Sequence, residues 1–364
     1  MKAPGVGIVG IGVHLPETIR RNDFWNPEQL AAFKKRKKDD IGLLSAREEL
    51  ASSELGLIVR EEMARWKADP FHGAVERRVA GDGVRPSDME VAAAQAALKD
   101  AGLAAGDIDL LLVLSIPPDR PAPANAPIVH QRLGLRSDCA AIAIDNVCTG
   151  LFFQLQLAAP MIAAGHARHA LLVQSALYSS ILDYANPVST TMGDAASAVV
   201  LGRVREGHGI LGHQSFIDSS FHDIAIVAAP HDEAWYSGHG PLTLQSGDPS
   251  KLVDVPVVSA QAARDSIGRA LTEAGLTAKD VSFFTSHQPN ASFNAICRRS
   301  AGLDGPGVRF VDSFAEYGAV SSSVVPLNLR LGQQRGLLRD GEVAVIYSTG
   351  AGMSWAATVL RWGR

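Results

Sequence analysis

The chain has 364 residues, of which 46% are hydrophobic and 20% are charged, a composition typical of a globular protein with a large core. Its net charge of −4 argues against nucleic acid or an anionic membrane surface as a partner. The three cysteines are too few for a disulfide framework, and their spacing is not that of a metal site. The N-terminus lacks the features of a signal peptide, and no apolar run reaches the roughly 18 residues of a membrane span. We therefore expect a cytoplasmic protein without a metal ion.

Residues 6–13 are apolar and rich in glycine, which predicts a buried first strand. Such glycines also occur in dinucleotide-binding motifs. Here the segment continues into His14, Leu15 and Pro16 rather than into a helix, and no acidic strand end follows at the expected distance. We therefore reject a dinucleotide site at this strand.

Residues 23–70 form a charged and mostly helical insertion, with a basic run at 34–38 followed by Asp39 and Asp40. The preferred interpretation of this run is a solvated helix face, and the alternative is a docking patch for an acidic carrier protein. An amphipathic helix is then predicted over 87–101, followed by a buried strand over 108–116.

The segment around Cys148 has the pattern of a strand followed directly by a helix. The apolar run 140–144 leads into Cys148, and a helical pattern starts at Gly150. A cysteine at a helix N-terminus is favoured as a thiolate by the unpaired backbone N–H groups and the helix dipole. Cys148 is thus either a nucleophile or a buried packing residue, and this segment alone does not decide between them.

An internal repeat indicates a duplicated α/β unit. Residues 97–103 are matched by 270–276, and both copies continue as a strand, a turn and a proline. At the same offset, Cys148 falls on Ser321. We expect an N-terminal half over 1–205 and a C-terminal half over 206–364, with parallel strands in a shared core. Residues 206–255, rich in Gly, His, Ser and Pro, are predicted to be loops over a pocket or at an interface.

A histidine follows a buried strand in the second half, within the stretch 283–290. His287 and Cys148 lie at corresponding ends of related units, so both side chains are expected to reach one pocket. A cysteine with a histidine forms a nucleophile and base pair, or a nucleophile with a donor to its thioester oxygen. Asn290 follows three residues after the histidine.

With these motifs in order, the chain resembles the β-ketoacyl-acyl-carrier-protein synthase III (KAS III) branch of the thiolase superfamily over nearly its whole length. The motifs that carry the resemblance are His14-Leu15-Pro16 after the first strand, Glu76-Arg77-Arg78-Val79-Ala80, Asp88-Met89, Cys148-Thr149-Gly150, Gly193-Asp194-Ala195, His287-Gln288-Pro289-Asn290, Tyr317-Gly318, and Gly350-Ala351-Gly352-Met353-Ser354-Trp355.

The resemblance implies a five-layered αβαβα fold that works as a homodimer, with no tightly bound cofactor. Acyl groups would arrive as thioesters of coenzyme A or of the phosphopantetheine of an acyl carrier protein. Cys148 would be the nucleophile, His287 would assist thioester chemistry, and Asn290 would support the histidine loop. The backbone N–H groups of Cys148 and Ala351 would form the oxyanion hole.

The chain departs from the family at a catalytic asparagine, where it has Ala319. In the family this amide and the histidine stabilise the enolate of decarboxylative condensation. The departure favours transfer of the acyl group from Cys148 to an oxygen, nitrogen or sulfur of a small-molecule acceptor, in a specialised or natural-product pathway. The alternatives are a Claisen-type condensing enzyme with another donor, for which Ser321 is a candidate, and a non-catalytic partner subunit of a heterodimeric synthase.

The resemblance also implies binding surfaces for the thioester carrier. Trp66, Phe71 and Arg77 are expected to line the coenzyme A entrance. Arg298 and Arg299, one helix after His287, are expected to face an acidic carrier protein.

Overall fold

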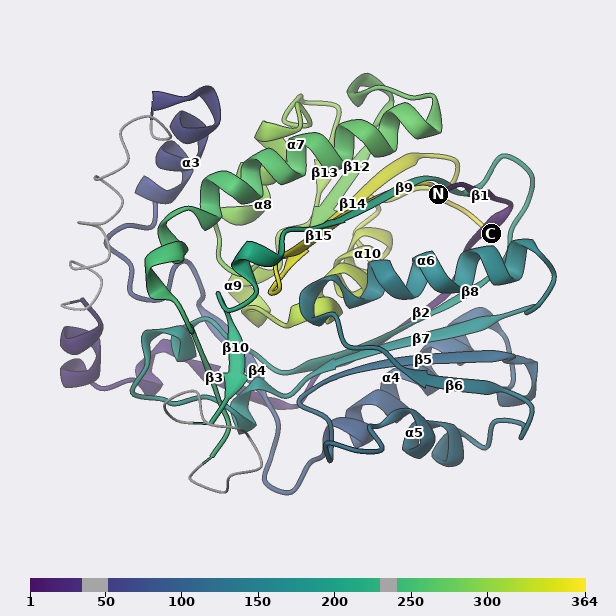
Figure 1. Cartoon of the computed structure of the whole chain (residues 1–364), viewed down its shortest axis with the longest axis horizontal. Coiled ribbons are helices and arrows are strands. Elements are labelled where there is room, and N and C mark those ends of the chain that lie inside the picture. Colours follow the sequence, from purple (N-terminus) through teal and green to yellow (C-terminus); the bar gives the residue numbers. More distant parts are fainter. Residues whose placement is uncertain (35–51, 230–240) are drawn as a thin grey trace.

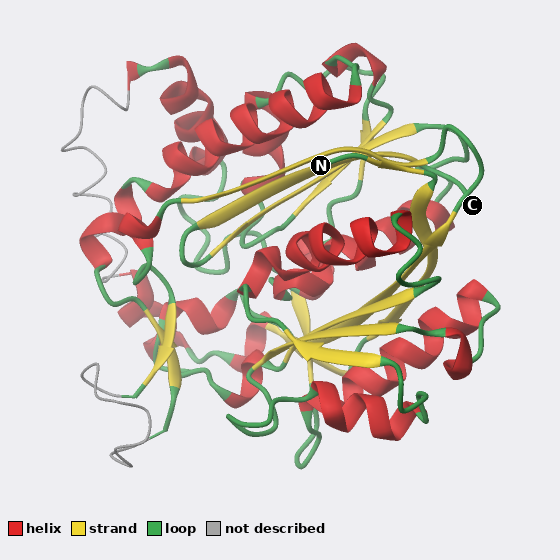
Figure 2. Ribbon diagram, turned by 45° about the vertical axis from the view of Figure 1, so that its right-hand side comes forward, coloured by secondary structure: helices red, strands yellow, loops and turns green. Residues whose placement is uncertain are grey.

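The structure is a computed structural model that describes residues 1–34, 52–229 and 241–364. The described chain forms two large β-sheets, which lie one above the other with helices between them and on their outer faces (Figures 1 and 2). The basic run at 34–38 and its acidic continuation, interpreted above as a solvated helix face, lie almost wholly outside the described residues. Among those residues, no helix is long and apolar enough to cross a bilayer.

The first sheet contains β2 (Val6–His14), β5 (Leu110–Ile116), β6 (Ala140–Ala143), β7 (Ala170–Ala176) and β8 (Ala195–Arg203). Their order across the sheet is β2-β8-β7-β5-β6. β5 runs parallel to β6 and β7, whereas β8 runs antiparallel to β7 and β2. The outer face packs against α4 (Pro86–Ala101) and α5 (Ala126–Leu133).

The second sheet contains β1 (Ala3–Pro4), β9 (Gly209–Ile217), β12 (Phe283–Ser286), β13 (Arg309–Phe310), β14 (Val343–Gly350) and β15 (Ser354–Arg361). Their order is β1-β9-β15-β14-β12-β13. α7 (Val255–Ala274) and α8 (Phe293–Ser300) cover its outer face. The prediction of loops over 206–255 is wrong for residues 209–217, which form the strand β9. The prediction relied on the Gly and Ser content of the segment and overlooked its apolar residues. Ile210 is buried in the central core, and Leu211 packs against the apolar cluster that includes α7.

Two helices, α6 (Gly150–Ala163) and α10 (Val324–Gln334), lie between the sheets, and each contacts strands of both. Together with both inner sheet faces they form one large apolar core. The layers are therefore helix, sheet, helix, sheet, helix, which confirms the predicted five-layered αβαβα fold.

The two sheets repeat one topology. The order β2-β8-β7-β5-β6 corresponds to β9-β15-β14-β12-β13, and β1 adds an extra strand beside β9. The predicted division at residue 205 falls in the turn between β8 and β9, although β1 belongs to the second sheet. Glycines on the first strand of each unit let its outer helix come close, since a Cβ at Gly12 would lie 2.0 Å from Ala93 O and one at Gly212 would lie 2.2 Å from Ala270 O.

The register of the repeat needs a correction of one residue. The 3₁₀ turn Val147–Thr149 precedes α6, and the turn Ser321–Ser323 precedes α10. The first residue of each has a positive φ, 36° at Val147 and 53° at Ser321. Cys148 therefore corresponds to Ser322 and not to Ser321. The reason is that the chain from α7 to α10 is one residue longer than the chain from α4 to α6.

Smaller elements are attached at one side of the sheets. β3 (Thr18–Arg21) pairs with β4 (Glu76–Val79), and β10 (Ile226–Ala228) pairs with β11 (Thr243–Gln245). α9 (Phe314–Tyr317) precedes the 3₁₀ turn Ser321–Ser323. In the inserted segment, a 3₁₀ turn at Asn22–Phe24, helical residues 27–34 and α3 (Glu54–Ala64) agree with the predicted helical character.

Candidate active site

Cys148 lies on a sharp turn between β6 and α6. The preceding residue, Val147, has a positive φ, which is rare for a β-branched side chain. The turn places Cys148 at the N-terminal end of α6, where unpaired backbone N–H groups and the helix dipole favour a thiolate.

Side chains of the second half hold this turn in place. The Ser322 hydroxyl donates to the carbonyl oxygens of Val147 at 2.9 Å and of Cys148 at 3.0 Å. The Ser348 hydroxyl donates to the Cys148 carbonyl at 2.7 Å. These bonds tie the turn to the second half of the chain, so the position of Cys148 depends on both halves together.

His287 follows directly after β12 and is brought to Cys148. Its backbone N–H donates to Tyr347 O at 2.9 Å, and its ring packs edge-on against Phe293. The side chain is only 6% exposed. Within the described part of the chain, the buried Nδ1 atom has no hydrogen-bond partner. The structure thus brings the His287 side chain to Cys148, as predicted, and the role of each residue stays a prediction.

The environment of the Cys148 sulfur favours the thiolate. Burial alone would raise the pKa of this thiol. The charge of His287 and hydrogen bonds from His287, Ser321 and Tyr178 act in the opposite direction and hold the pKa below its usual value. The Ser321 hydroxyl donates to Sγ at 3.4 Å. A depressed thiol pKa is the property that a cysteine nucleophile needs.

Tyr178 was not predicted from the sequence. It lies just after β7, it is buried, and it is among the groups that lower the pKa of the Cys148 thiol. Burial, followed by the neighbouring Cys148, keeps the pKa of Tyr178 well above its usual value, so the phenol stays protonated. A signal was present, because Tyr178 is a polar residue after an apolar strand, as His287 is.

Asn290 lies on the loop after His287, and Ala351 lies on the turn beside Cys148. Asn290 Oδ1 accepts from the backbone N–H groups of Ser292 at 3.0 Å and Phe293 at 3.1 Å, and so ties the histidine loop to the start of α8. Ala351 follows Gly350, where a Cβ would come within 3.3 Å of the Cys148 backbone nitrogen. The β14–β15 turn therefore passes beside the turn that carries the nucleophile.

Ala319, which was predicted to replace the family asparagine, lies in an apolar cluster with Trp25, Phe71 and Phe314 and is 2% exposed. Its backbone N–H donates to Thr191 O at 2.7 Å. The inserted segment thus contributes the ring of Trp25 to the apolar surroundings of Ala319.

Of the residues expected at the coenzyme A entrance, Arg77 is misplaced. It is completely buried, stacks on Trp25 and Phe71, and donates to Asn22 Oδ1 and to Thr190 O. Burial lowers the pKa of Arg77 to about 10. The rings of Trp25 and Phe71 enclose the Arg77 side chain. Arg77 therefore joins the segment around Asn22 to the segment around Thr190 inside the protein.

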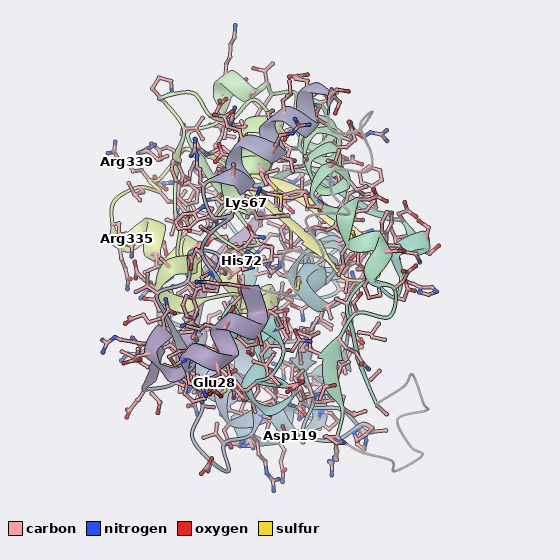
Figure 3. The ribbon with its side chains drawn as sticks, turned by 90° about the vertical axis from the view of Figure 1, so that its left-hand side faces the viewer. Glu28, Lys67, His72, Asp119, Arg335 and Arg339 are labelled. Carbon is pink, nitrogen blue, oxygen red and sulfur yellow. The ribbon has the colours of Figure 1, made fainter. Side chains whose placement is uncertain are left out.

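The other two residues predicted at this entrance have different exposures. Phe71 is mostly buried in the aromatic cluster, and Trp66 is half-buried with its ring beside Gly73. Lys67 and His72 both lie on the face of the molecule that is turned to the viewer in Figure 3. This face adjoins the histidine loop, since Ala291 N donates to His72 O at 3.1 Å.

The arginines expected to face a carrier protein are engaged within the chain. Arg299 forms ion pairs with Glu62 at 2.6 Å and Glu61 at 2.9 Å, both on α3. Arg298 stacks on Phe310, with its guanidinium carbon 4.1 Å from the ring centroid. Arg299 therefore holds the inserted helix α3, and the contact of these arginines with a carrier protein stays a prediction.

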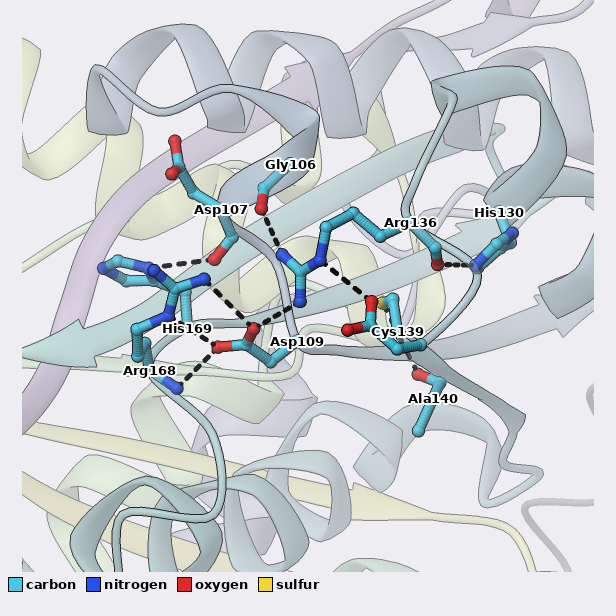
Figure 4. Close-up of polar contacts among 10 residues, drawn as sticks. Gly106, Asp107, Asp109, His130, Arg136, Cys139, Ala140, Arg168 and His169 are labelled. Atoms are coloured by element: carbon cyan, nitrogen blue, oxygen red, sulfur yellow. Dashed lines mark hydrogen bonds and ion pairs between the residues drawn. The ribbon is translucent and has the colours of Figure 1, made fainter.

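The remaining cysteines are not activated. Burial raises the pKa of Cys139 and raises that of Cys297 well above its usual value. Figure 4 shows Cys139 beside the ion pairs that Asp109 forms with Arg136 and Arg168. Among the described residues, no group of three or more His, Cys, Asp or Glu side chains could hold a metal ion.

Comparisons with known proteins agree with this arrangement. Residues 142–219 match the family model of 3-Oxoacyl-[acyl-carrier-protein (ACP)] synthase III, and residues 271–362 match the model of its C-terminal part. The β-ketoacyl-[acyl-carrier-protein] synthase III of Geobacillus kaustophilus is 30% identical, with 99% of this chain and all of that protein covered.

Solved structures are similar over the full length. The 3-oxoacyl-(acyl carrier protein) synthase III of Pseudomonas aeruginosa has a TM-score of 0.75 and 29% identity, with 99% of each chain covered. OleA of Xanthomonas campestris has a TM-score of 0.76 at 20% identity and covers all of both chains, which shows a shared fold.

Proposed function

The chain belongs to the 3-oxoacyl-[acyl-carrier-protein] synthase III family, and from this premise we propose that it transfers an acyl group through a thioester on Cys148 to an oxygen, nitrogen or sulfur acceptor. The family's substrates suggest a coenzyme A or carrier-protein thioester as donor.

The first half-reaction needs a nucleophile and a proton source, and the site contains both. The Cys148 thiolate attacks the thioester carbonyl, the bond to the donor sulfur breaks, and the departing thiolate takes a proton from His287. In the second half-reaction the acceptor gives its proton to His287 and attacks the acyl carbon. The bond to Sγ then breaks, and the electron pair returns to Cys148.

The observation that carries the choice of acyl transfer is Ala319 in its apolar cluster. Stabilising the enolate of a decarboxylated malonyl thioester requires directed donors, and losing one such donor typically costs about 3 kcal/mol of transition-state stabilisation. Acyl transfer has no enolate, so the absence of the amide side chain does not impair it. This distinction supports acyl transfer over condensation.

A condensing enzyme is the second candidate, and one observation favours it. The Ser321 hydroxyl lies 3.4 Å from the Cys148 sulfur. Rotation of this hydroxyl toward a substrate oxygen would supply the missing hydrogen bond.

The proposal includes a homodimer. The edge strand β6 is largely exposed although its sequence is apolar, and Ile142 is 50% exposed. β6 leads directly into the turn that carries Cys148, so a partner at this edge would lie close to the site.

The test is intact-protein mass spectrometry after incubation with acetyl, malonyl, longer and aromatic acyl thioesters of coenzyme A and of a carrier protein. An acyl adduct on the wild type and on Cys139→Ala, but not on Cys148→Ala, is expected. No adduct from any donor would contradict the proposal. Carbon dioxide release from a malonyl thioester by the acylated enzyme would favour condensation instead.

A further inference from the structure

We propose that Ser322 is a positioning residue for the oxyanion hole, because its hydroxyl holds the peptide plane between Val147 and Cys148 and so directs the Cys148 N–H toward the oxygen of the acyl group. The inference rests on the acyl-Cys148 chemistry of the proposed function. It adds a residue of the second half of the chain that acts on the reacting oxygen through the backbone.

The peptide unit between Val147 and Cys148 has a carbonyl oxygen at one end and the Cys148 N–H at the other. In a planar trans peptide these two groups point in opposite directions, so a partner that fixes Val147 O also fixes the direction of the Cys148 N–H. Gly150 N, at the start of α6, donates to Val147 O. The Ser322 hydroxyl donates to the same oxygen at 2.9 Å. Both lone pairs of this carbonyl are therefore used, one by each half of the chain.

The other contacts of Ser322 direct its single hydroxyl proton to Val147 O. Leu151 N donates to the Ser322 oxygen at 3.3 Å, which leaves the proton free for a carbonyl group. The Cys148 carbonyl is 3.0 Å away, but it already accepts from the Ser348 hydroxyl at 2.7 Å. Ser322 is also buried, so bulk water does not compete for the proton.

The Cys148 N–H itself is available to a substrate. Among the described residues it has no hydrogen-bond acceptor, as is usual for the first amides of a helix. Gly350 leaves room beside it, since a Cβ at this glycine would lie 3.3 Å from the Cys148 nitrogen. Hydrogen bonds to the carbonyl end of a peptide polarise it and strengthen its N–H as a donor. A fixed and polarised N–H is what a developing oxyanion requires.

The internal repeat explains why a serine of the second half reaches this peptide. Ser322 has in the second unit the place that Cys148 has in the first, since each follows a residue with a positive φ in the turn before a central helix. The position that carries the nucleophile in one unit thus carries, in the other, a hydroxyl that supports the nucleophile's turn.

Two reactions of the Cys148 sulfur separate a defective oxyanion hole from a displaced nucleophile. In acylation, Sγ forms a bond to a carbonyl carbon, and the carbonyl electron pair moves to oxygen. This pair then returns, and the leaving group departs with the electrons of its own bond. In alkylation by iodoacetamide, the thiolate displaces iodide from a methylene carbon and no oxyanion forms. A hydroxyl that serves only the oxyanion hole should therefore affect the first reaction alone.

The first experiment compares both reactions in the wild type and in Ser322→Ala, with p-nitrophenyl acetate as the acylating probe. This ester leaves an acetyl group on Cys148 and releases p-nitrophenolate, without coenzyme A or a carrier protein. Rates are corrected with Cys148→Ala. Ser322→Ala is expected to slow acylation about tenfold and to leave alkylation within about twofold of the wild type. The expected loss is below that for removal of a whole oxyanion-hole donor, because Gly150 N still holds Val147 O.

The matched control is Ser323→Ala, the next serine of the same turn. The Ser323 hydroxyl donates to Gln174 O at 3.2 Å and Ala195 O at 3.4 Å, away from the nucleophile, so neither rate is expected to change. Equal slowing of both reactions by Ser322→Ala, or of neither, would overturn the inference, and so would a wild type that the ester does not acylate. If the ester acylates Cys148 but no coenzyme A or carrier thioester does, the proposed function is overturned instead, and the comparison of variants still decides the role of Ser322.

The second measurement is the infrared carbonyl band of the isotope-labelled acetyl group on Cys148. Hydrogen bonds from an oxyanion hole weaken the carbonyl bond and lower its stretching frequency. Ser322→Ala is expected to raise this frequency, whereas Ser323→Ala should leave it at the wild-type value. A band that Ser322→Ala does not move would overturn the inference, because a serine with a merely structural role would leave the acyl oxygen in the same field.

Discussion

At the scale of single residues, the two halves of the fold meet at Cys148. Val147 holds a backbone conformation that costs a β-branched residue about 1–3 kcal/mol, and such strain persists only where its surroundings enforce it. Ser322 and Ser348 of the second half bind the carbonyl groups of this turn. The nucleophile therefore depends on the packing of both halves, and neither half would present it alone.

Ala319→Asn tests whether the site has space for the family's amide. The added amide would enter a packed cluster of aromatic side chains without an assigned partner, so we expect the variant to lose about 1–3 kcal/mol of unfolding free energy. The measurement is the urea midpoint at fixed protein concentration. Ala315→Asn, at an exposed position on α9, is the control and should change stability by less than about 0.5 kcal/mol. Equal stability of both variants would show that the cluster can accommodate an amide.

The residues predicted best from the sequence are those at strand ends. Cys148 and His287 each follow an apolar strand, and the repeat indicated that both ends point to one pocket. Tyr178 was overlooked because tyrosine is a common packing residue, although it follows an apolar strand as His287 does. Arg77 was misplaced because a charged side chain suggests exposure, and the aromatic rings that bury it come from residues distant in sequence.

At the scale of elements, α4 carries a buried carboxyl group into the first sheet. Glu90 is completely buried, and it accepts hydrogen bonds from Ser115 and Ser175, both at 2.6 Å, and from Asn125 at 2.9 Å. Burial raises the pKa of Glu90 to about 7 in spite of these bonds. α4 is thus joined to β5 and β7 by a group whose charge changes near neutral pH.

This carboxyl makes stability depend on pH. The pKa is higher in the folded state than in the unfolded chain, so the folded protein binds more protons between about pH 4.5 and 7. The stabilisation is complete below about pH 4.5 and is lost as the pH rises through 7, by about 3 kcal/mol in total. Glu90→Gln should remove this contribution, measured as urea midpoints from pH 5 to pH 8. An unchanged pH dependence in the variant would contradict this assignment.

The inserted helix α3 is attached to α7 by an exposed ion pair and to α8 by a buried one. Glu62 is 3% exposed and binds Arg299, whereas the pair of Glu54 with Arg264 is exposed. Arg299→Met would remove a partner of a buried carboxylate, so we expect α3 to open more easily by about 2 kcal/mol. The measurement is hydrogen exchange of α3 amides. Arg264→Met, the matched exposed pair, should change exchange by less than about 1 kcal/mol, and equal effects would contradict the argument.

Elements were predicted well where their pattern was strong. α4 and the strands β2 and β5 agree with the sequence to within about two residues. β9 was missed because its Gly and Ser residues suggested loops, and its role as a strand follows from pairing with β15, which no local pattern reveals.

At the scale of the whole molecule, duplication explains why the catalytic groups meet. The carboxyl ends of the parallel strands of both units point toward Cys148. The central helices α6 and α10 start from equivalent turns. The first turn carries the nucleophile, and the second carries serines that bind the first. The repeat was visible in the sequence, whereas the one-residue change of register was not, because it arises in the connection between α7 and α10.

The remaining edge of the first sheet predicts how two copies associate. β6 presents an unpaired backbone edge with the exposed apolar residue Ile142, and an edge of this kind tends to pair with another chain. Pairing of β6 with its copy about a twofold axis would join the two first sheets and bring both Cys148 turns to the interface. We expect a dimer of the 38.5 kDa chain in analytical ultracentrifugation and a shift to monomer for Ile142→Lys. Leu57→Lys, at an exposed apolar position on α3, should leave the dimer intact. A monomeric wild type, or a dimer that Ile142→Lys does not weaken, would contradict this mode of assembly.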